Sequence, residues 1–205
     1  MRWCRFILDK EVVYGIVKDG NVVPVDGTPF TTYSETSTLL PINSISLLVP
    51  VLPQTFYAAG TNYMDHVRRM AEMTGKSINP PQAADIGYRA NNALIAHNEA
   101  IVIPKDASEK VQYEGELVVV IGKPTRNITP EQVKDYILGY TIGNDVSERT
   151  WQAQDRTLWR AKNSDTFKPM GPWIETDVEL DTMDTVVRVN GQELQNFKTN
   201  NMIFD

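Results

Sequence analysis

Two glutamates that lie close together in the chain have the spacing of a carboxylate metal site. Glu114 and Glu116 directly precede an apolar run, 117–121, of the kind found in strands that are buried on both faces. Side chains alternate along a strand, so both glutamates point to the same face, with only Gly115 between them. Two like charges at the mouth of a buried strand repel each other unless one is protonated or a cation lies between them.

A hard divalent cation would remove this repulsion, because Mg²⁺, Mn²⁺ and Ca²⁺ prefer carboxylate oxygen ligands. Asp145 follows a second apolar run, 137–143, and is therefore the predicted third ligand. The alternative is that the two glutamates lie on an exposed strand end and each faces solvent. With one cysteine and two histidines, the chain does not suggest a zinc site of the usual Cys/His kind.

The composition is that of a soluble globular protein rather than a disordered one. The chain has 205 residues, of which 41% are hydrophobic and 22% charged, and its net charge is -6. This acidic balance, without any basic run, argues against a nucleic-acid partner. No apolar run approaches the roughly 18 residues that span a bilayer, and no signal-peptide pattern opens the chain. Since Cys4 is the only cysteine, we expect a cytoplasmic protein in which Cys4 is a buried strand residue.

The elements that must position these carboxylates divide into two predicted domains, with a boundary near Val51. A small N-terminal β domain over 1–51 contains expected strands at 3–8, 12–17 and 21–25, with a hairpin turn at 18–21. The second domain, over 52–205, carries the predicted metal ligands. The predicted class is α+β, predominantly β.

The second domain combines two expected helices with several short strands. One helix is expected over 64–74, with Gly75 as its C-cap. The other is expected over 130–138, with Thr129 as N-cap and Pro130 at its first position. Further strands are expected at 56–59, 93–96, 100–103, 117–121, 140–143 and 186–189, the last turning at 190–191 into another strand.

Six segments of this domain resemble motifs of the fumarylacetoacetate hydrolase family. They read GTNYMDH at 60–66, YEGEL at 113–117, GYTIGNDVS at 139–147, RAKNSDTF at 160–167, GPWI at 171–174 and NMIF at 201–204. The resemblance covers most of the chain from Ala58 to its end. It implies a fumarylacetoacetase-like mixed β-roll behind a small N-terminal β domain, usually as a homodimer. It also implies Mg²⁺ or Mn²⁺ held by Glu114, Glu116 and Asp145.

The family acts on small compounds that carry a 2-oxo acid or a 1,3-dicarbonyl group. Its members include acylpyruvate hydrolases, oxaloacetate decarboxylases and isomerases of aromatic-catabolism intermediates. A metal can chelate the 2-oxo and carboxylate oxygens and stabilise the resulting enolate. The resemblance therefore implies a metal-dependent C–C hydrolase or decarboxylase. The alternatives are an isomerase of an unsaturated 2-oxo dicarboxylate, and a family member that binds metal or a partner without turnover.

The resemblance also suggests roles for residues around the ligands. His66 would be the general base for a water nucleophile, because an imidazole titrates near neutral pH. The alternative is that His66 is a surface or capping residue. Lys162 would supply positive charge to a substrate carboxylate or oxyanion. Tyr63, Gln152 and Thr199 would contact the substrate, whereas His97 is expected to be structural or exposed.

The sequence departs from the family pattern at three places. Many hydrolases of the family carry a glutamate one turn after the motif histidine, whereas Arg69 stands here. Either the acid comes from elsewhere in the chain, or the reaction needs no strong water-activating pair, which would favour decarboxylation or isomerisation. Arg89 stands in place of a lysine, and we predict that it faces the pocket and binds a substrate carboxylate; the alternative is a surface salt bridge. Family members usually continue past the NMIF segment, and a chain that ended at Asp205 would lack strands of the roll and expose an apolar edge.

Overall fold

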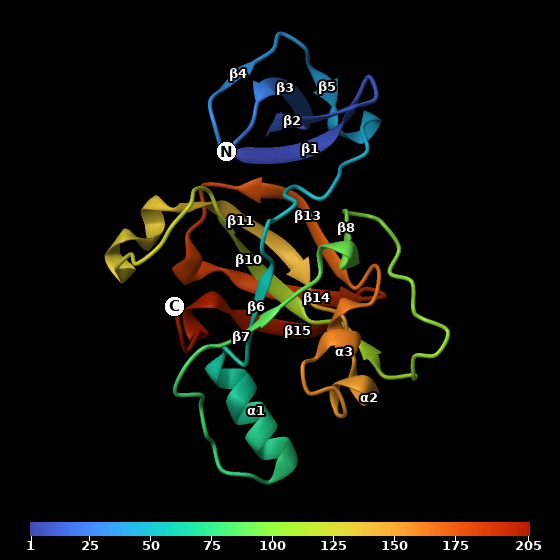
Figure 1. Cartoon of the computed structure of the whole chain (residues 1–205), viewed down its shortest axis with the longest axis vertical. Coiled ribbons are helices and arrows are strands. Elements are labelled where there is room, and N and C mark those ends of the chain that lie inside the picture. Colours follow the sequence, from blue (N-terminus) through green and yellow to red (C-terminus); the bar gives the residue numbers. More distant parts are fainter.

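The computed structural model describes residues 1–205, and strands make up most of its regular structure (Figure 1). The largest sheet has nine strands, whose main path is β10-β11-β13-β1-β2-β3-β4, while β5 pairs with β3 and β8 with β13. Three two-stranded sheets, β6–β7, β9–β12 and β14–β15, complete the strand set. The predicted α+β, predominantly β class is confirmed. None of the helices has the length and apolarity needed to cross a membrane.

Five N-terminal strands form one end of the molecule, at the top of Figure 1. They are β1 (Arg2–Leu8), β2 (Glu11–Lys18), β3 (Asn21–Gly27), β4 (Tyr33–Glu35) and β5 (Leu40–Pro41). Asp19 and Gly20 have left-handed backbone conformations, with φ of 46° and 76°, in the predicted β2–β3 turn. Alternation along β1 buries Cys4 and Phe6 beside Val22. The prediction for Cys4 is confirmed, and burial raises the pKa of its thiol to about 12.

The other strands surround the predicted site. They are β6 (Tyr57–Gly60), β7 (Asp85–Tyr88), β8 (Leu94–Ile95), β9 (Val111–Gln112), β10 (Gly115–Ile121), β11 (Ile137–Asn144), β12 (Ser147–Glu148), β13 (Lys168–Glu175), β14 (Asp184–Val189) and β15 (Gln192–Lys198). The 3₁₀ helices are Ile42–Ser44, Asn91–Ala93, Pro130–Asp135, Leu180–Thr182 and Thr199–Asn201. The predicted β14–β15 hairpin turns at Asn190 and Gly191, which both have positive φ.

Three α-helices complete the fold: α1 (Met64–Thr74), α2 (Arg149–Gln152) and α3 (Trp159–Asn163). The helix α1 has the predicted bounds and projects from the end of the molecule opposite the N-terminal strands (Figure 1). Gly75 ends it in a left-handed conformation (φ 66°), and its N–H donates to the Ala71 carbonyl. At its other end, the Asp65 N–H donates to Asn201 Oδ1 at 2.7 Å, which ties α1 to the last 3₁₀ helix.

The first strand, β1, joins the N-terminal strands to the strands of the site. Arg2 pairs with Glu175 and Trp3 with Ile174, both on β13. Arg2 Nε also donates to Glu175 Oε2 at 2.8 Å. The side chains of Trp3 and Ile174 belong to one buried cluster that includes Val120 of β10. The core beneath the site is therefore shared with the N-terminal strands.

The antiparallel pair β10 and β11 carries the predicted ligands. Glu116 lies opposite Gly143 in this pair, and Gly115 lies opposite Asn144. A Cβ at Gly115 would lie only 2.4 Å from Cγ2 of Val187 on β14. Glycine is therefore required at this point because the β14–β15 hairpin packs directly against the start of β10.

Two predictions of secondary structure are wrong. Residues 100–103 form no strand, because their backbone is not paired with a neighbouring strand; Val102 instead donates from its N–H to Thr166 Oγ1 at 2.8 Å. The second predicted helix is a 3₁₀ helix that ends at Asp135, since residues 137 and 138 already belong to β11. Its predicted start is confirmed: the N–H of Thr129 donates to Oε1 of Gln132 at 3.0 Å.

Candidate metal and substrate site

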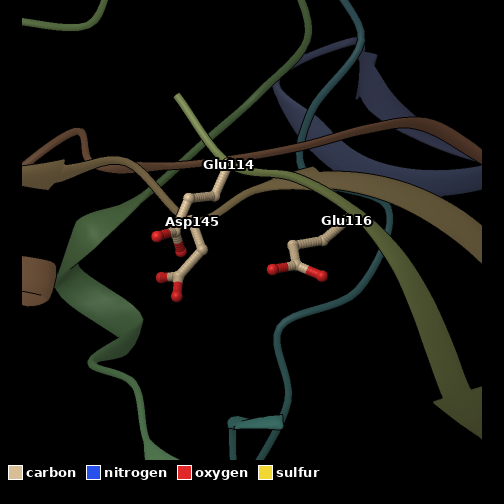
Figure 2. A group of neighbouring side chains, drawn as sticks. All are labelled: Glu114, Glu116 and Asp145. Atoms are coloured by element: carbon tan, nitrogen blue, oxygen red, sulfur yellow. The ribbon is translucent and has the colours of Figure 1, made fainter. Parts of the chain in front are cut away.

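The structure brings the three predicted ligands together (Figure 2). Oxygen atoms of Glu114, Glu116 and Asp145 all lie within 4.8 Å of one another. The start of β10 meets the end of β11 in the antiparallel pair, so the residues flanking these ends converge. Two hydrogen bonds fix the arrangement: the Asp145 N–H donates to the Glu114 carbonyl at 2.8 Å, and the Glu114 N–H donates to Asn144 Oδ1 at 2.9 Å.

Asp145 is buried and surrounded by basic side chains. Arg89 donates from Nε to Oδ1 at 2.9 Å and from Nη2 to Oδ2 at 2.8 Å. Lys162 Nζ donates to Oδ2 at 2.8 Å, and Lys168 Nζ lies 2.8 Å from Oδ1. Burial by itself would raise the pKa of Asp145, but these hydrogen bonds and charges outweigh burial and hold the pKa well below its usual value.

Basic side chains also neutralise the charge of Glu114. Lys162 Nζ donates to Oε2 at 2.5 Å, and Arg149 Nη1 donates to Oε1 at 2.5 Å. The same Arg149 nitrogen donates to Oε1 of Gln152, one turn later in α2, at 2.8 Å. The helix α2 therefore places Arg149 and Gln152 beside the carboxylates.

Glu116 differs from both, because it has no hydrogen bond or ion pair to a basic side chain. Burial and the negative charges of Asp145 and Glu114 raise its pKa to about 8. A carboxylate in this position gains most from a cation placed among the three side chains. A divalent metal fits the donor set, since all three groups offer carboxylate oxygens and no sulfur or imidazole takes part.

Lys162 lies at the centre of the charge network, as a residue of the short helix α3. Its buried amine donates to Glu114, Asp145 and the hydroxyl of Ser147, the last at 2.8 Å. All three hydrogens of the ammonium group are therefore used. Lys162 orients two of the predicted ligands but makes no hydrogen bond or ion pair with Glu116.

Two basic residues of the site, Lys168 and Arg149, were not predicted. Lys168 is buried at the start of β13, where Nζ donates to the carbonyls of Val146 at 3.1 Å and Phe167 at 3.0 Å. Burial lowers its pKa to about 8, although Asp145 acts in the opposite direction. A lysine that directly follows the RAKNSDTF segment, and an arginine between Asp145 and Gln152, are the sequence signals that could have found them.

Arg89 lies in the site, and the alternative of a surface salt bridge is wrong. Its side chain is only 6% exposed. Its partner is the predicted metal ligand Asp145, however, and not an open position for a substrate. The guanidinium also donates from Nη1 to the Tyr88 carbonyl at 3.0 Å. Arg89 therefore belongs to the ligand network in this structure.

Tyr63 and Gln152 lie near the carboxylates as well. The ring of Tyr63 packs edge-on against Phe197, with centroids 4.5 Å apart. Burial, followed by the charge of Glu116, raises the pKa of the Tyr63 hydroxyl to about 12. The amide oxygen of Gln152 accepts from Arg149, which leaves its amide nitrogen without a hydrogen bond. Both residues can therefore contribute polar hydrogens toward a ligand.

His66 and Thr199 do not join this network. His66 is exposed in the first turn of α1 and makes no side-chain hydrogen bond. Thr199 is buried, and its hydroxyl donates to the carbonyls of Leu180 and Met183. This hydroxyl is therefore used within the fold and is not available to a substrate. Arg69 and His97 are both exposed.

Comparisons with known proteins bear on the same residues. The family model described as "Fumarylacetoacetate (FAA) hydrolase C-terminal" matches residues 55–205, and the model "Rv2993c-like, N-terminal" matches residues 1–50. "Protein Rv2993c" of Mycobacterium tuberculosis is 43% identical over 180 residues, which cover 86% of this chain and 65% of that protein. The mitochondrial oxaloacetate tautomerase fahd2 of Xenopus laevis is 36% identical over 172 residues, which cover 81% of this chain and 52% of that protein.

A solved structure agrees over the whole chain. The crystal structure of 5-carboxymethyl-2-hydroxymuconate delta-isomerase from Mycobacterium smegmatis matches with a TM-score of 0.87 and 34% identity, covering 100% of this chain and 78% of that one. The chain spans between about half and two thirds of the length of the two curated relatives named above. Since one family model matches most of the sequence and these relatives exceed 30% identity, the chain belongs to the fumarylacetoacetate hydrolase family.

Proposed function

We propose that this chain is a divalent-metal-dependent enzyme that converts a small 2-oxo acid through its enolate. The observation that carries this proposal is the convergence of Glu114, Glu116 and Asp145, with Glu116 lacking a basic partner. Mg²⁺ and Mn²⁺ are the proposed ions, because the donors are carboxylate oxygens. When bound, such an ion would supply Lewis-acid stabilisation of an enolate oxygen.

The residues around the carboxylates have complementary proposed roles. Lys162 and Arg149 hold Glu114 in place, and Lys162 also orients Asp145. The free amide nitrogen of Gln152 would donate to a substrate oxygen. The family resemblance assigns proton transfer to His66, although its side chain is exposed on α1 and outside the charge network of this structure.

The favoured reaction is a proton shift on a 2-oxo dicarboxylate, which would make the chain a tautomerase or an isomerase. This reaction needs no activated water, and His66 has no acidic partner that would help it to activate one. Arg69 stands one turn after His66, where an acid would be needed. The oxaloacetate tautomerase and the muconate isomerase among the similar proteins support the same choice.

Hydrolysis or decarboxylation, the reaction expected from the sequence, is the second candidate. It shares the metal-stabilised enolate, so Lys162 and the carboxylates would serve it equally. Decarboxylation needs no water-activating base, whereas hydrolysis would require His66 to act alone.

One assay separates these reactions. The purified protein is given the enol form of oxaloacetate, acylpyruvates and an unsaturated 2-oxo dicarboxylate, with and without Mg²⁺ or Mn²⁺. We expect metal-dependent loss of the enol absorbance without release of CO₂, and loss of the effect in Glu116→Ala. Release of CO₂ or of a cleaved acid would support the second candidate. No metal-dependent turnover of any of these compounds would contradict the proposal.

We also propose that the chain forms a homodimer. Val119, Ile121 and Ile142 are apolar, exposed and on the same face of the β10–β11 pair, which supports burial of this face by a second copy. Light scattering on the purified protein tests this: we expect the mass of two chains, and the mass of one would contradict it.

A further inference from the structure

Basic groups crowd both carboxylate oxygens of Asp145 in the structure, through three hydrogen bonds and one further ion pair. A carboxylate offers about four lone-pair directions, two on each oxygen. Arg89 Nε and Lys168 Nζ approach Oδ1 at 2.9 and 2.8 Å, while Arg89 Nη2 and Lys162 Nζ approach Oδ2, both at 2.8 Å. A cation that binds Asp145 therefore competes with these four basic nitrogen atoms for the same two oxygens.

Of the three basic residues that contact Asp145, Arg89 has the side chain with the fewest hydrogen bonds to other groups. Lys168 is also held by two backbone carbonyls, and Lys162 by Ser147 and Glu114. Moving either lysine would leave several buried groups unsatisfied. Apart from Asp145, the guanidinium of Arg89 donates only to the carbonyl of its own neighbour, Tyr88, at 3.0 Å, while its backbone N–H donates to the Phe56 carbonyl at 2.9 Å.

The position of Arg89 in the fold also allows it to move. It directly follows β7, which pairs only with β6 and stands outside the nine-stranded sheet. Lys168, in contrast, begins β13 inside that sheet. Gly87 leaves space beside the guanidinium, because a Cβ there would lie 3.0 Å from Arg89 Nη1.

The positive charges around Glu114 and Asp145 favour a movement of the Arg89 guanidinium that accompanies the binding of an anion. Four basic side chains (Arg89, Arg149, Lys162 and Lys168) already contact Glu114 or Asp145. A divalent cation adds two further positive charges to the same small volume, and this repulsion falls if the guanidinium leaves or an anion arrives. A guanidinium released from one carboxylate is well suited to bind another in the same bidentate way.

We propose that Arg89 is a displaceable counterion of the metal site: it neutralises Asp145 until a divalent cation binds, and then transfers its guanidinium to the carboxylate of the substrate. The inference rests on the metal site of the proposed function. It makes cation and substrate binding mutually reinforcing, because each favours the position of Arg89 that the other needs. It also reconciles the substrate contact predicted from the sequence with the ion pair in the structure.

The test measures the affinity for Mn²⁺ by calorimetry and electron paramagnetic resonance, without substrate. We expect Arg89→Gln to bind Mn²⁺ about tenfold more tightly than the wild type, because the competing positive charge is gone. A residue that only positioned Asp145 would give weaker binding on removal. Arg188→Gln is the matched control, since Arg188 is exposed and pairs with Glu193 away from the site. Unchanged or weaker Mn²⁺ binding by Arg89→Gln would overturn the inference.

A second variant guards against misfolding of the first. Gly87→Ala crowds the guanidinium without removing its charge, and we expect tighter Mn²⁺ binding again, by a smaller factor. Pyruvate serves as the anionic probe: it should increase Mn²⁺ affinity by a larger factor in the wild type than in Arg89→Gln. Equal factors would overturn the transfer of Arg89 to the anion. If the wild type bound no Mn²⁺ at all, the metal site of the proposed function would fail as well.

Discussion

The N–H of Asp145 donates to the carbonyl of Glu114 at 2.8 Å. This single backbone contact connects the residue that precedes β10 with the residue that follows β11, and it brings two predicted ligands into one rigid unit. Lys162 spans the same pair through its side chain. Glu116, which lacks such a contact, is the ligand whose charge depends most on a cation.

This difference predicts opposite effects of Glu116→Gln on stability and on metal binding. Without metal, the variant removes a like charge from the cluster, and we expect the free energy of unfolding to rise by about 1 kcal/mol. Addition of Mn²⁺ should raise the melting temperature of the wild type but not that of the variant. Thermal unfolding with and without Mn²⁺ measures both effects. A variant that is less stable than the wild type without metal would contradict the assignment.

Lys162→Met should be strongly destabilising. It leaves the buried Asp145 and the carboxylate of Glu114 without a shared counterion, which costs about 3 kcal/mol for a buried pair. Urea unfolding of the variant measures the loss. Lys134→Met, at an exposed position without an ion pair, is the control and should change stability little. Similar losses of unfolding free energy in the two variants would refute the role of Lys162 as the shared counterion of Glu114 and Asp145.

The first strand should detach more easily in acid. Burial would raise the pKa of Glu175, but the hydrogen bonds and charges of Arg2 and the N-terminal amine lower it below its usual value of 4.5. Because the folded-state pKa is depressed, this stabilisation is full above 4.5 and is lost as the pH falls through the folded-state value. We expect the melting temperature of the wild type to fall more than that of Glu175→Gln below about pH 4.5. An equal fall of the melting temperature with pH in the two proteins would contradict this stabilising role of Glu175.

Gly115→Ala should destabilise the site by a steric route. Its methyl group would lie 2.4 Å from Cγ2 of Val187, so β10 or β14 must shift, at a cost of about 2 kcal/mol. Val187→Ala in the same chain should recover part of this loss, since it removes the atom that clashes. A double-mutant cycle of unfolding free energies measures the coupling. Additive effects of the two substitutions would show that the contact is not responsible.

Local patterns in the sequence predicted the elements that depend on local physics. The helix 64–74 has an apolar stripe that buries Val67 and Ala71 and a glycine at its end, so its bounds follow from the sequence. The three carboxylates could be grouped because strand alternation and two apolar runs place them at neighbouring strand ends. Residues 100–103 have the composition of a strand, but pairing depends on a partner that the local sequence does not reveal.

The partners of the carboxylates depend on tertiary structure and could not be predicted. Lys168 reads as a solvated lysine at a strand start, yet the fold buries it against Asp145 and two carbonyls. Thr199 reads as a residue of a binding loop, but two carbonyls of the chain take up its hydroxyl. Only the assembled fold shows that Arg89 pairs with Asp145, a predicted metal ligand.

Titration of the metal-free protein with Mn²⁺ is the most direct test of the carboxylate site. We expect one Mn²⁺ bound per chain in the wild type and in Glu193→Gln, an exposed control on β15, and loss of this binding in Glu116→Gln. Equal binding of Mn²⁺ by the wild type and Glu116→Gln, or no binding by either, would contradict the claim that these three carboxylates form a metal centre.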